Sequence, residues 1–364
     1  MLPYRREKII VCDNIVFELQ SVGGVSKYWS ETIKRLDNSL DALSFLEGPC
    51  VEQNIFRAEL SLRSPVFPDR GWLLRRRLFS SRVQADVFHS SYYRISHQTK
   101  ANIVTIHDFM NELFPTGPRD VLLARLKRRA CRNAKMIVAV SERTRQDLLK
   151  HYPFVDPGRV KVIYNGVDGS FYPDPRKHPF GIDGRSLTPR GYFLYVGGRG
   201  YCKNFPLVLR FLAESRRQGL ELPLITVGGG PLTESEWTFA RELGIQESAI
   251  HQYYHLPTSE LRVLYSNCMA LLIPSIYEGF GLPAAEGARC GALVLSARGS
   301  ALDEIVGETE FAFDLRREEE ASRLLSLGLE SQYGESERVR MQERSNKFNW
   351  DSSSERLIEV YNEI

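Results

Sequence analysis

The chain has 364 residues, 43% of them hydrophobic and 26% charged, and its formal net charge is +3. This length exceeds the needs of one ordinary α/β core, so we expect two domains, each with a substantial buried core. No stretch is long and apolar enough to span a bilayer as a helix. The cysteines lack the paired spacing of a disulfide framework or a zinc site, so we expect reduced thiols and a cytoplasmic protein. They stand at positions 12, 50, 131, 202, 268 and 290.

Charge is distributed unevenly along the chain. Residues 1–170 hold 27 Lys and Arg against 18 Asp and Glu, whereas the remainder holds 21 against 27. A basic first half favours a negatively charged partner, such as a phospholipid surface, a lipid diphosphate or nucleic acid. Nucleic acid is the weakest of these, because no recognised binding motif accompanies the charge.

Short apolar runs alternate with longer amphipathic ones, which is typical of strands and helices that build a parallel sheet. In chain order, the expected strands are residues 8–12, 86–89, 102–106, 136–140, 160–163, 192–196, 222–227, 269–273 and 292–295. Two such series imply two similar halves. We expect an α/β protein with a first domain at 1–172, a linker at 173–191, a second domain at 192–347 and a final helix within 348–364. The linker assignment rests on four prolines, three glycines and no apolar period.

The most informative motif is Pro-Ser-Ile-Tyr-Glu-Gly-Phe-Gly-Leu-Pro-Ala-Ala-Glu at residues 274–286, directly after an expected core strand. Ligands of open α/β sheets bind beyond the carboxyl ends of the strands. Gly279 and Gly281 would let backbone N–H groups approach an anion, and the following helix would add its dipole. Glu286 would accept hydrogen bonds from a ribose diol and Glu278 from a sugar hydroxyl. The motif predicts a sugar-nucleotide site, although each carboxylate alone is equally well read as a surface charge.

A second motif, Val-Gly-Gly-Arg-Gly-Tyr-Cys-Lys-Asn at residues 196–204, follows another expected strand. Fixed cations can stabilise the charge that develops on a departing diphosphate. Arg199 offers a planar fork for phosphate oxygens, and Lys203 a mobile point charge. Alone, such a turn is more often a solvated loop. Its place after a strand, together with the 274–286 motif, favours a phosphate clamp.

The first half contains two weaker candidates. Gly23 and Gly24 precede an amphipathic helix and could face an anion, but they do not form a complete dinucleotide fingerprint. His107 and Asp108 end an expected strand. A lone histidine there is more often structural than catalytic, and Asp108 could cap the following segment or face an acceptor hydroxyl.

Together these motifs resemble retaining glycosyltransferases of the GT-B fold, specifically glycosyltransferase family 4, along nearly the whole chain. Glu278 and Glu286 stand where that family has paired glutamates, and Arg199, Lys203 and Asn204 match its Arg, Lys and Asn. The resemblance implies two facing Rossmann-like domains and a C-terminal helix that crosses back to the first.

The resemblance also implies roles for individual residues. It assigns catalysis to His107, Arg199, Lys203 and Glu278, with His107 directed at the donor sugar. Donor-binding residues would be Gly23, Gly24, Gly198, Asn204, Gly229, Gly279, Phe280, Gly281, Leu282 and Glu286. The acceptor hydroxyl would attack on the face that the diphosphate vacates, once the domains close about the linker. No metal ligand set is evident, so we expect metal-independent chemistry without a cofactor.

Acceptor and membrane contacts are predicted in the first domain. Tyr92, Tyr93 and Arg94 would suit an acceptor cleft through ring stacking and phosphate contact, although ordinary loop packing explains them as well. Residues 70–82 and 119–135 combine apolar and cationic faces, as do helices that lie on anionic membranes. Most charged helix faces are merely solvated, so both interpretations stay open.

We expect a hexosyltransferase that moves mannose from GDP-mannose to a lipid-linked saccharide in bacterial O-antigen or capsule assembly. Rhamnose, fucose, galactose, glucose and N-acetylglucosamine remain open as donor sugars. A rival is a GT-B sugar-nucleotide epimerase, which would need catalytic carboxylates in the first domain. Another is a catalytically silent scaffold peripheral to the membrane, which would have no reason to retain Arg199, Lys203 and Glu286.

Overall fold

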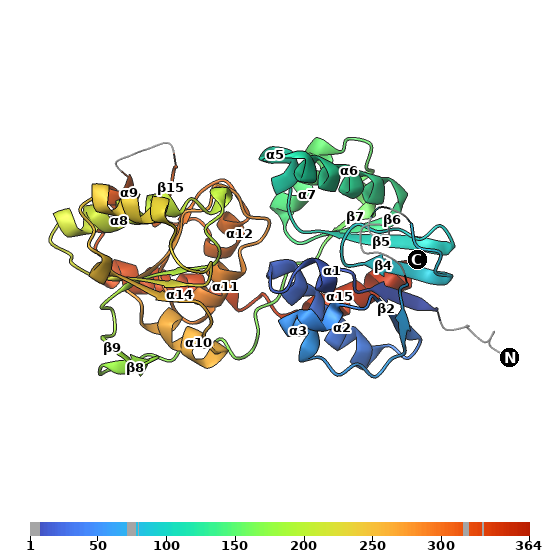
Figure 1. Ribbon diagram of the computed structural model, residues 1–364, viewed down its shortest axis with the longest axis horizontal. Coiled ribbons are helices and arrows are strands. Elements are labelled where there is room, and N and C mark those ends of the chain that lie inside the picture. The colour runs from blue at the N-terminus through green and yellow to red at the C-terminus, as the bar shows by residue number, and fades with distance from the viewer. Residues whose placement is uncertain (1–7, 71–77, 79, 316–319, 330) are drawn as a thin grey trace. The chain divides into compact units, whose positions relative to one another are not determined.

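The computed structural model describes residues 8–70, 78, 80–315, 320–329 and 331–364. The chain forms two compact units (Figure 1). The first combines Met1–Gly166 with Asn349–Ile364, and the second consists of Val167–Phe348. The final segment of the chain therefore returns to the unit in which the chain began.

The first unit is built on a parallel sheet, in which the described strands have the order β3-β2-β1-β4-β5-β6-β7. These strands are β1 (Ile10–Asp13), β2 (Leu43–Glu47), β3 (Val66–Pro68), β4 (Ala85–Ser90), β5 (Thr99–Ile106), β6 (Ala134–Ala139) and β7 (Val160–Val162). Phe88 and Ile103 in the central strands are fully buried. Because all strands run in one direction, the loops that follow them lie at a common edge, where ligands of such sheets bind.

Helices connect the strands of the first unit. They are α1 (Val16–Leu19), α2 (Gly24–Ser39), α3 (Ile55–Ala58), α5 (Met110–Leu113), α6 (Pro118–Asn133), α7 (Glu142–His151) and α15 (Trp350–Glu363). Their ends follow local sequence rules. Pro118 stands in the first turn of α6, and the hydroxyl of Ser141 caps α7 by accepting from the backbone N–H of Thr144.

The second unit contains a parallel sheet with the order β12-β11-β10-β13-β14-β15 and an antiparallel pair, β8-β9. The strands are β8 (Phe180–Ile182), β9 (Arg185–Leu187), β10 (Phe193–Val196), β11 (Leu224–Val227), β12 (Ile250–Tyr253), β13 (Ala270–Ile273), β14 (Val294–Ala297) and β15 (Ala312–Phe313). The helices are α8 (Phe205–Arg217), α9 (Glu234–Glu242), α10 (Thr258–Asn267), α11 (Leu282–Arg289), α12 (Leu302–Val306), α13 (Glu320–Ser326) and α14 (Gln332–Ser345). Residues of β10, β11 and β13 form the buried centre of this sheet.

The last helix, α15, packs against α2 within the first unit. Arg35 of α2 pairs with Asp351 at 2.5 Å, and the rings of Tyr28 and Trp350 lie 5.8 Å apart. Asn349 caps this helix, because its side-chain oxygen accepts from the N–H of Asp351 at 2.7 Å.

Two details differ from the sequence prediction. Residues 173–191, expected as a linker, group with the second unit and contain the β8-β9 pair, which turns at Asp183 and Gly184 with left-handed φ angles. The strands β2, β3, β12 and β15 were not predicted. They are short, or they lack the apolar run or the regular apolar–polar alternation by which a strand is recognised in a sequence.

Candidate active site

The loop after β13 carries the predicted pair of glutamates. Gly281 has φ +99°, and a Cβ there would approach Leu302 Cδ2 to 2.6 Å, so both conformation and packing require glycine. The helix α11 begins at Leu282, with Pro283 in its first turn. Phe280 is buried, with its ring edge-on to Phe348 at 5.2 Å. Gly279 and Gly281 thus form a packed turn that leads into α11.

Lys203 and Glu278, which the sequence predicted as separate contacts to phosphate and sugar, lie side by side. Lys203 Nζ is 2.5 Å from Glu278 Oε1, and the hydroxyl of Ser275 donates to the same oxygen at 2.8 Å. The Lys203 side chain is 32% exposed and that of Glu278 12%. The exits of β10 and β13 therefore present an accessible ammonium next to a mostly buried carboxylate.

Glu286 lies one turn into α11 and contacts a residue that sequence analysis did not select. The hydroxyl of Tyr265, on α10, donates to Glu286 Oε2 at 3.2 Å. The Tyr265 ring is fully buried, and burial together with the charge of Glu286 raises the pKa of its hydroxyl well above the usual value. The hydroxyl therefore stays protonated and acts as a fixed donor to Glu286.

Arg199 has a different environment from Lys203. Its side chain is 5% exposed, and its Nε donates to Glu236 Oε1 at 2.9 Å. Its terminal nitrogens donate to the backbone carbonyls of Gly228, Gly230 and Pro231 at 3.3, 3.1 and 2.6 Å. Arg199 thus joins the loop after β10 to the glycine loop after β11, which includes the predicted donor residue Gly229.

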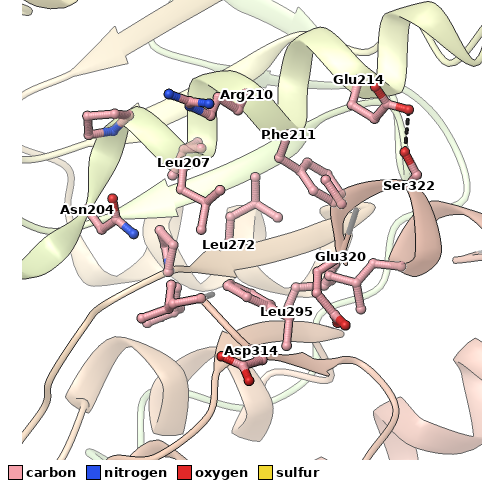
Figure 2. Close-up of a pocket in the computed structure, with 18 of the residues that line it drawn as sticks. Asn204, Leu207, Arg210, Phe211, Glu214, Leu272, Leu295, Asp314, Glu320 and Ser322 are labelled. Carbon is pink, nitrogen blue, oxygen red and sulfur yellow. Dashed lines mark hydrogen bonds between the residues drawn. The ribbon is translucent and has the colours of Figure 1, made fainter. Parts of the chain in front are cut away.

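The other predicted residues of this region shape the start of α8. Asn204 adopts a left-handed conformation at the N-cap of α8, and the carbonyl of Gly198 accepts from the hydroxyl of Tyr195 at 2.5 Å. Asn204 also lies at the rim of a cavity of about 480 Å³ on the α8 and α13 side of the sheet (Figure 2). The cavity wall is mixed, with the apolar side chains Leu207, Phe211 and Leu272 in the centre of the view and charged side chains such as Arg210 and Glu320 around them. Lys203, Glu278 and Glu286 do not line it.

In the first unit, the glycine pair lies at the N-terminus of α2. A Cβ on Gly23 would approach Gln20 Oε1 to 2.6 Å, and the same oxygen accepts from the N–H of Ser26 at 3.2 Å. A Cβ on Gly24 would meet no neighbouring side chain within 4 Å. The Gln20 side chain therefore already accepts a hydrogen bond from one N–H group at the N-terminus of α2. Gly24 borders open space.

His107 follows β5 and is buried, with 8% of its surface exposed. Burial, partly opposed by the charge of Asp108, lowers the pKa of His107 to about 4. Tyr28 packs edge-on against the ring at 4.8 Å, and Nε2 has no hydrogen-bond partner among the described residues. Asp108 accepts from the N–H of Met110, the first residue of α5, at 3.0 Å. The imidazole is thus neutral, and its Nε2 is a buried polar atom without a hydrogen-bond partner among the described residues.

The predicted acceptor residues have unequal exposure. Arg94 is 3% exposed, and one terminal nitrogen pairs with Asp13 at 2.9 Å and Asp69 at 2.8 Å. Tyr93 is buried, with Lys127 5.5 Å from its ring centre. Neither side chain is accessible for the predicted acceptor contact, because both are part of the packing of the first unit. Tyr92 is half-buried.

Comparisons with known proteins identify the family. Residues 22–171 match Glycosyltransferase Family 4, and residues 184–348 match Glycosyl transferases group 1. The chain is a glycosyltransferase. It is 23% identical to O-antigen chain mannosyltransferase B of Escherichia coli, over 93% of this chain and 95% of that protein. It is 26% identical to the D-rhamnosyltransferase WbpZ of Pseudomonas aeruginosa, over 78% and 79%.

The fold of this glycosyltransferase is that of the GT-B enzymes. The crystal structure of Anabaena HepE in complex with UDP-glucose matches with a TM-score of 0.72 at 15% identity, covering 98% of this chain and 99% of that one. The two Rossmann-like units with parallel sheets are the architecture that the motifs predicted. Among the described residues, no helix has the length and apolar character needed to cross a membrane, and no group of three or more His, Cys, Asp or Glu side chains could hold a metal ion.

Proposed function

We propose that this glycosyltransferase moves a hexose from a nucleotide sugar to a lipid-linked or saccharide acceptor in bacterial surface polysaccharide assembly, with retention at the anomeric carbon and without a divalent cation. Mannose from GDP-mannose is the first candidate donor. The E. coli relative, named as an O-antigen chain mannosyltransferase, supports the sugar and the pathway class. The neighbour HepE, solved with UDP-glucose, supports a nucleotide-sugar donor.

The observation that carries this proposal is the pairing of Lys203 with Glu278 at 2.5 Å beside the first turns of α11. In the free enzyme the two charges neutralise each other. A bound donor would offer Lys203 a diphosphate oxygen and Glu278 a sugar hydroxyl, so both groups would exchange one partner for a ligand atom. Glu286 would accept from the ribose hydroxyls.

In the transfer step, the bond between the anomeric carbon and the diphosphate oxygen breaks, and the acceptor hydroxyl attacks on the face that the diphosphate leaves. A diphosphate oxygen accepts the proton of the hydroxyl, so the mechanism uses no protein nucleophile. The ammonium of Lys203 stabilises the negative charge that develops on the leaving group.

A membrane contact through α6 is part of the proposal. Val121 and Leu122 are 44% and 37% exposed, and the cations of Arg128 and Arg132 lie 5.5 and 4.9 Å from the ring of the partly exposed Phe154. A face that combines apolar side chains with arginines suits an anionic lipid surface, where a lipid-linked acceptor resides. The second predicted segment, residues 70–82, lies largely outside the described residues.

The proposal is tested by thermal unfolding with GDP, UDP, dTDP, ADP and their sugar derivatives. A ligand at about one hundred times its Kd adds about 2.7 kcal/mol of stability and raises Tm by several degrees. We expect a shift with one nucleotide, GDP first, that disappears in Glu286→Ala. Turnover with the corresponding sugar nucleotide should then fall about 100-fold or more in Lys203→Ala. No shift with any nucleotide would favour the silent scaffold.

A further inference from the structure

The guanidinium of Arg199 is held by hydrogen bonds to other parts of the second unit. Four of its hydrogen bonds reach protein acceptors, namely Glu236 and the carbonyls of Gly228, Gly230 and Pro231. A guanidinium has five N–H donors, so these bonds occupy nearly all of its capacity. With 5% of the side chain exposed, little of it is available to a ligand. Lys203, four residues later, is 32% exposed.

The loop that Arg199 holds has an unusual backbone. Gly228, Gly229 and Gly230 have φ angles of +84°, +73° and +72°, a run that only glycine adopts at low cost. A Cβ on Gly229 would approach Arg199 Nη1 to 2.7 Å and the carbonyl oxygen of Gly197 to 3.0 Å. The loop therefore packs directly on the guanidinium and on the neighbouring loop after β10.

Glu236 completes the arrangement. Its Oε1 accepts from Arg199 Nε, while its Oε2 accepts from the N–H of Thr233 at 2.7 Å in the capping box of α9. One carboxylate thus links Arg199 to the start of α9. Both loops and this helix start lie after strands β10 and β11, at the edge of the sheet where the donor is proposed to bind.

We propose that Arg199 is a positioning residue, which acts with Glu236 to hold the glycine loop 228–231 in the shape that receives the nucleotide part of the donor. It does not serve as a second cation on the diphosphate. This inference rests on the proposed function. Since Arg199 and Glu236 act through the same loop, removal of either should have the same consequence as removal of both.

The experiment compares Arg199→Lys, Glu236→Gln and the double variant. The control is Arg241→Lys with Glu234→Gln, an ion pair at 2.5 Å that involves α9 and does not contact the loop. Hydrogen exchange of the peptide that contains residues 228–232 is measured first, in the free protein. Steady-state kinetics with the sugar nucleotide identified by the thermal panel follow.

We expect both single variants and the double variant to accelerate exchange in this peptide equally. In all three variants the donor KM should rise about tenfold and kcat should change less than twofold. The reason is that each variant disturbs the same loop, which binds the donor and takes no part in the chemical step. The control pair should leave both quantities unchanged. Unaltered exchange in Arg199→Lys overturns the proposal, as does accelerated exchange with an unchanged KM.

A direct phosphate contact predicts another pattern. In that case Arg199→Lys lowers kcat at saturating donor, as Lys203→Ala does, whereas Glu236→Gln has no effect. Additive effects in the double variant would likewise overturn the proposal. If the wild type transfers no sugar, the proposed function fails. The exchange data still decide whether Arg199 and Glu236 hold the loop.

Discussion

At the scale of single residues, Tyr265 and Glu286 show how a buried side chain fixes a carboxylate at a binding surface. The Tyr265 hydroxyl donates to Glu286 Oε2 at 3.2 Å from a ring that is fully buried. A Cβ on Gly287 would approach that ring to 3.2 Å, so α11 packs closely on it. The carboxylate that is proposed to contact the ribose is therefore held in position by Tyr265.

Tyr265→Phe should therefore weaken donor binding and also lower stability, because the hydrogen bond is already present in the free protein. A hydrogen bond to a charged group contributes about 1.5–3 kcal/mol to stability. A loss of about 1.4 kcal/mol from binding, once Glu286 is no longer held in position, would raise the nucleotide Kd about tenfold. The control is Tyr192→Phe, because the hydroxyl of Tyr192 is also buried and donates to the carbonyl of Leu264 at 2.8 Å. Calorimetric titration should show a changed Kd in the first variant alone. Equal Kd values in both would contradict a role for Tyr265.

The sequence indicated which loops contribute to the candidate site, because the polar and glycine residues of these loops directly follow apolar strands. It could not separate Lys203 from Arg199, since the partner of Arg199 is Glu236, which lies 37 positions away. The burial of Arg94 was hidden for the same reason, because it pairs with Asp13, 81 positions away. Burial by distant partners decides whether a cation is available to a ligand, and no local pattern reports it.

At the scale of elements, α15 is joined to the first sheet by a buried histidine. His89, at the end of β4, lies with Nδ1 2.7 Å from the Tyr361 hydroxyl and Nε2 3.0 Å from Thr105 Oγ1. The ring of Trp29 lies edge-on at 5.0 Å. Burial, with a smaller contribution from His107, lowers the pKa of His89 to about 3.

His89 should make stability depend on pH. Its pKa is about 3 in the folded protein and about 6.5 in the unfolded chain, so the unfolded chain binds more protons between these values. The stability that the neutral ring contributes is complete above about pH 6.5 and decreases as pH falls, by up to about 1.4 kcal/mol per pH unit. His89→Asn removes this titration, so the loss between pH 7.5 and 5 should be smaller than in wild type.

The measurement is urea unfolding followed by tryptophan fluorescence at pH 7.5, 6 and 5. Taking the difference between variant and wild type cancels the contributions of His107 and Asp13, which both proteins share. His97→Asn is the control, because His97 is exposed in the same unit. Identical pH slopes for His89→Asn and wild type would mean that the histidine does not titrate on unfolding.

Element prediction succeeded where apolar runs are long or central, as in β5 and β13. It failed for β12, with the sequence Ile-His-Gln-Tyr, because its two middle residues are only half-buried and polar. The β8-β9 pair was missed since prolines and glycines around it are typical of a linker. Its position depends on contacts such as the hydroxyl of Tyr253 with the carbonyl of Ile182, which sequence spacing does not reveal.

At the scale of the whole molecule, the charge difference between the two parts of the chain has a testable consequence. Residues 1–170 carry 27 basic and 18 acidic residues, and the remainder carries 21 and 27. An electrostatic attraction to an anionic surface would therefore act mainly on the first unit, and the exposed face of α6 with Phe154 would make the contact. This attraction is screened beyond about 8 Å at physiological ionic strength, so it acts only when that face lies close to the surface.

The protein should therefore bind vesicles that contain phosphatidylglycerol more tightly than vesicles of phosphatidylcholine alone, and 0.5 M salt should reduce the difference. Replacing Arg128 and Arg132 by Gln removes about 1 kcal/mol each, so the partition coefficient should fall about thirtyfold. Replacing Arg217 and Arg241 by Gln removes the same charge from the second unit, where their side chains are 73% and 49% exposed. If both pairs reduce vesicle sedimentation equally, net charge alone accounts for binding and α6 is not the contact; if only the α6 pair does, its arginines make the contact with the lipid.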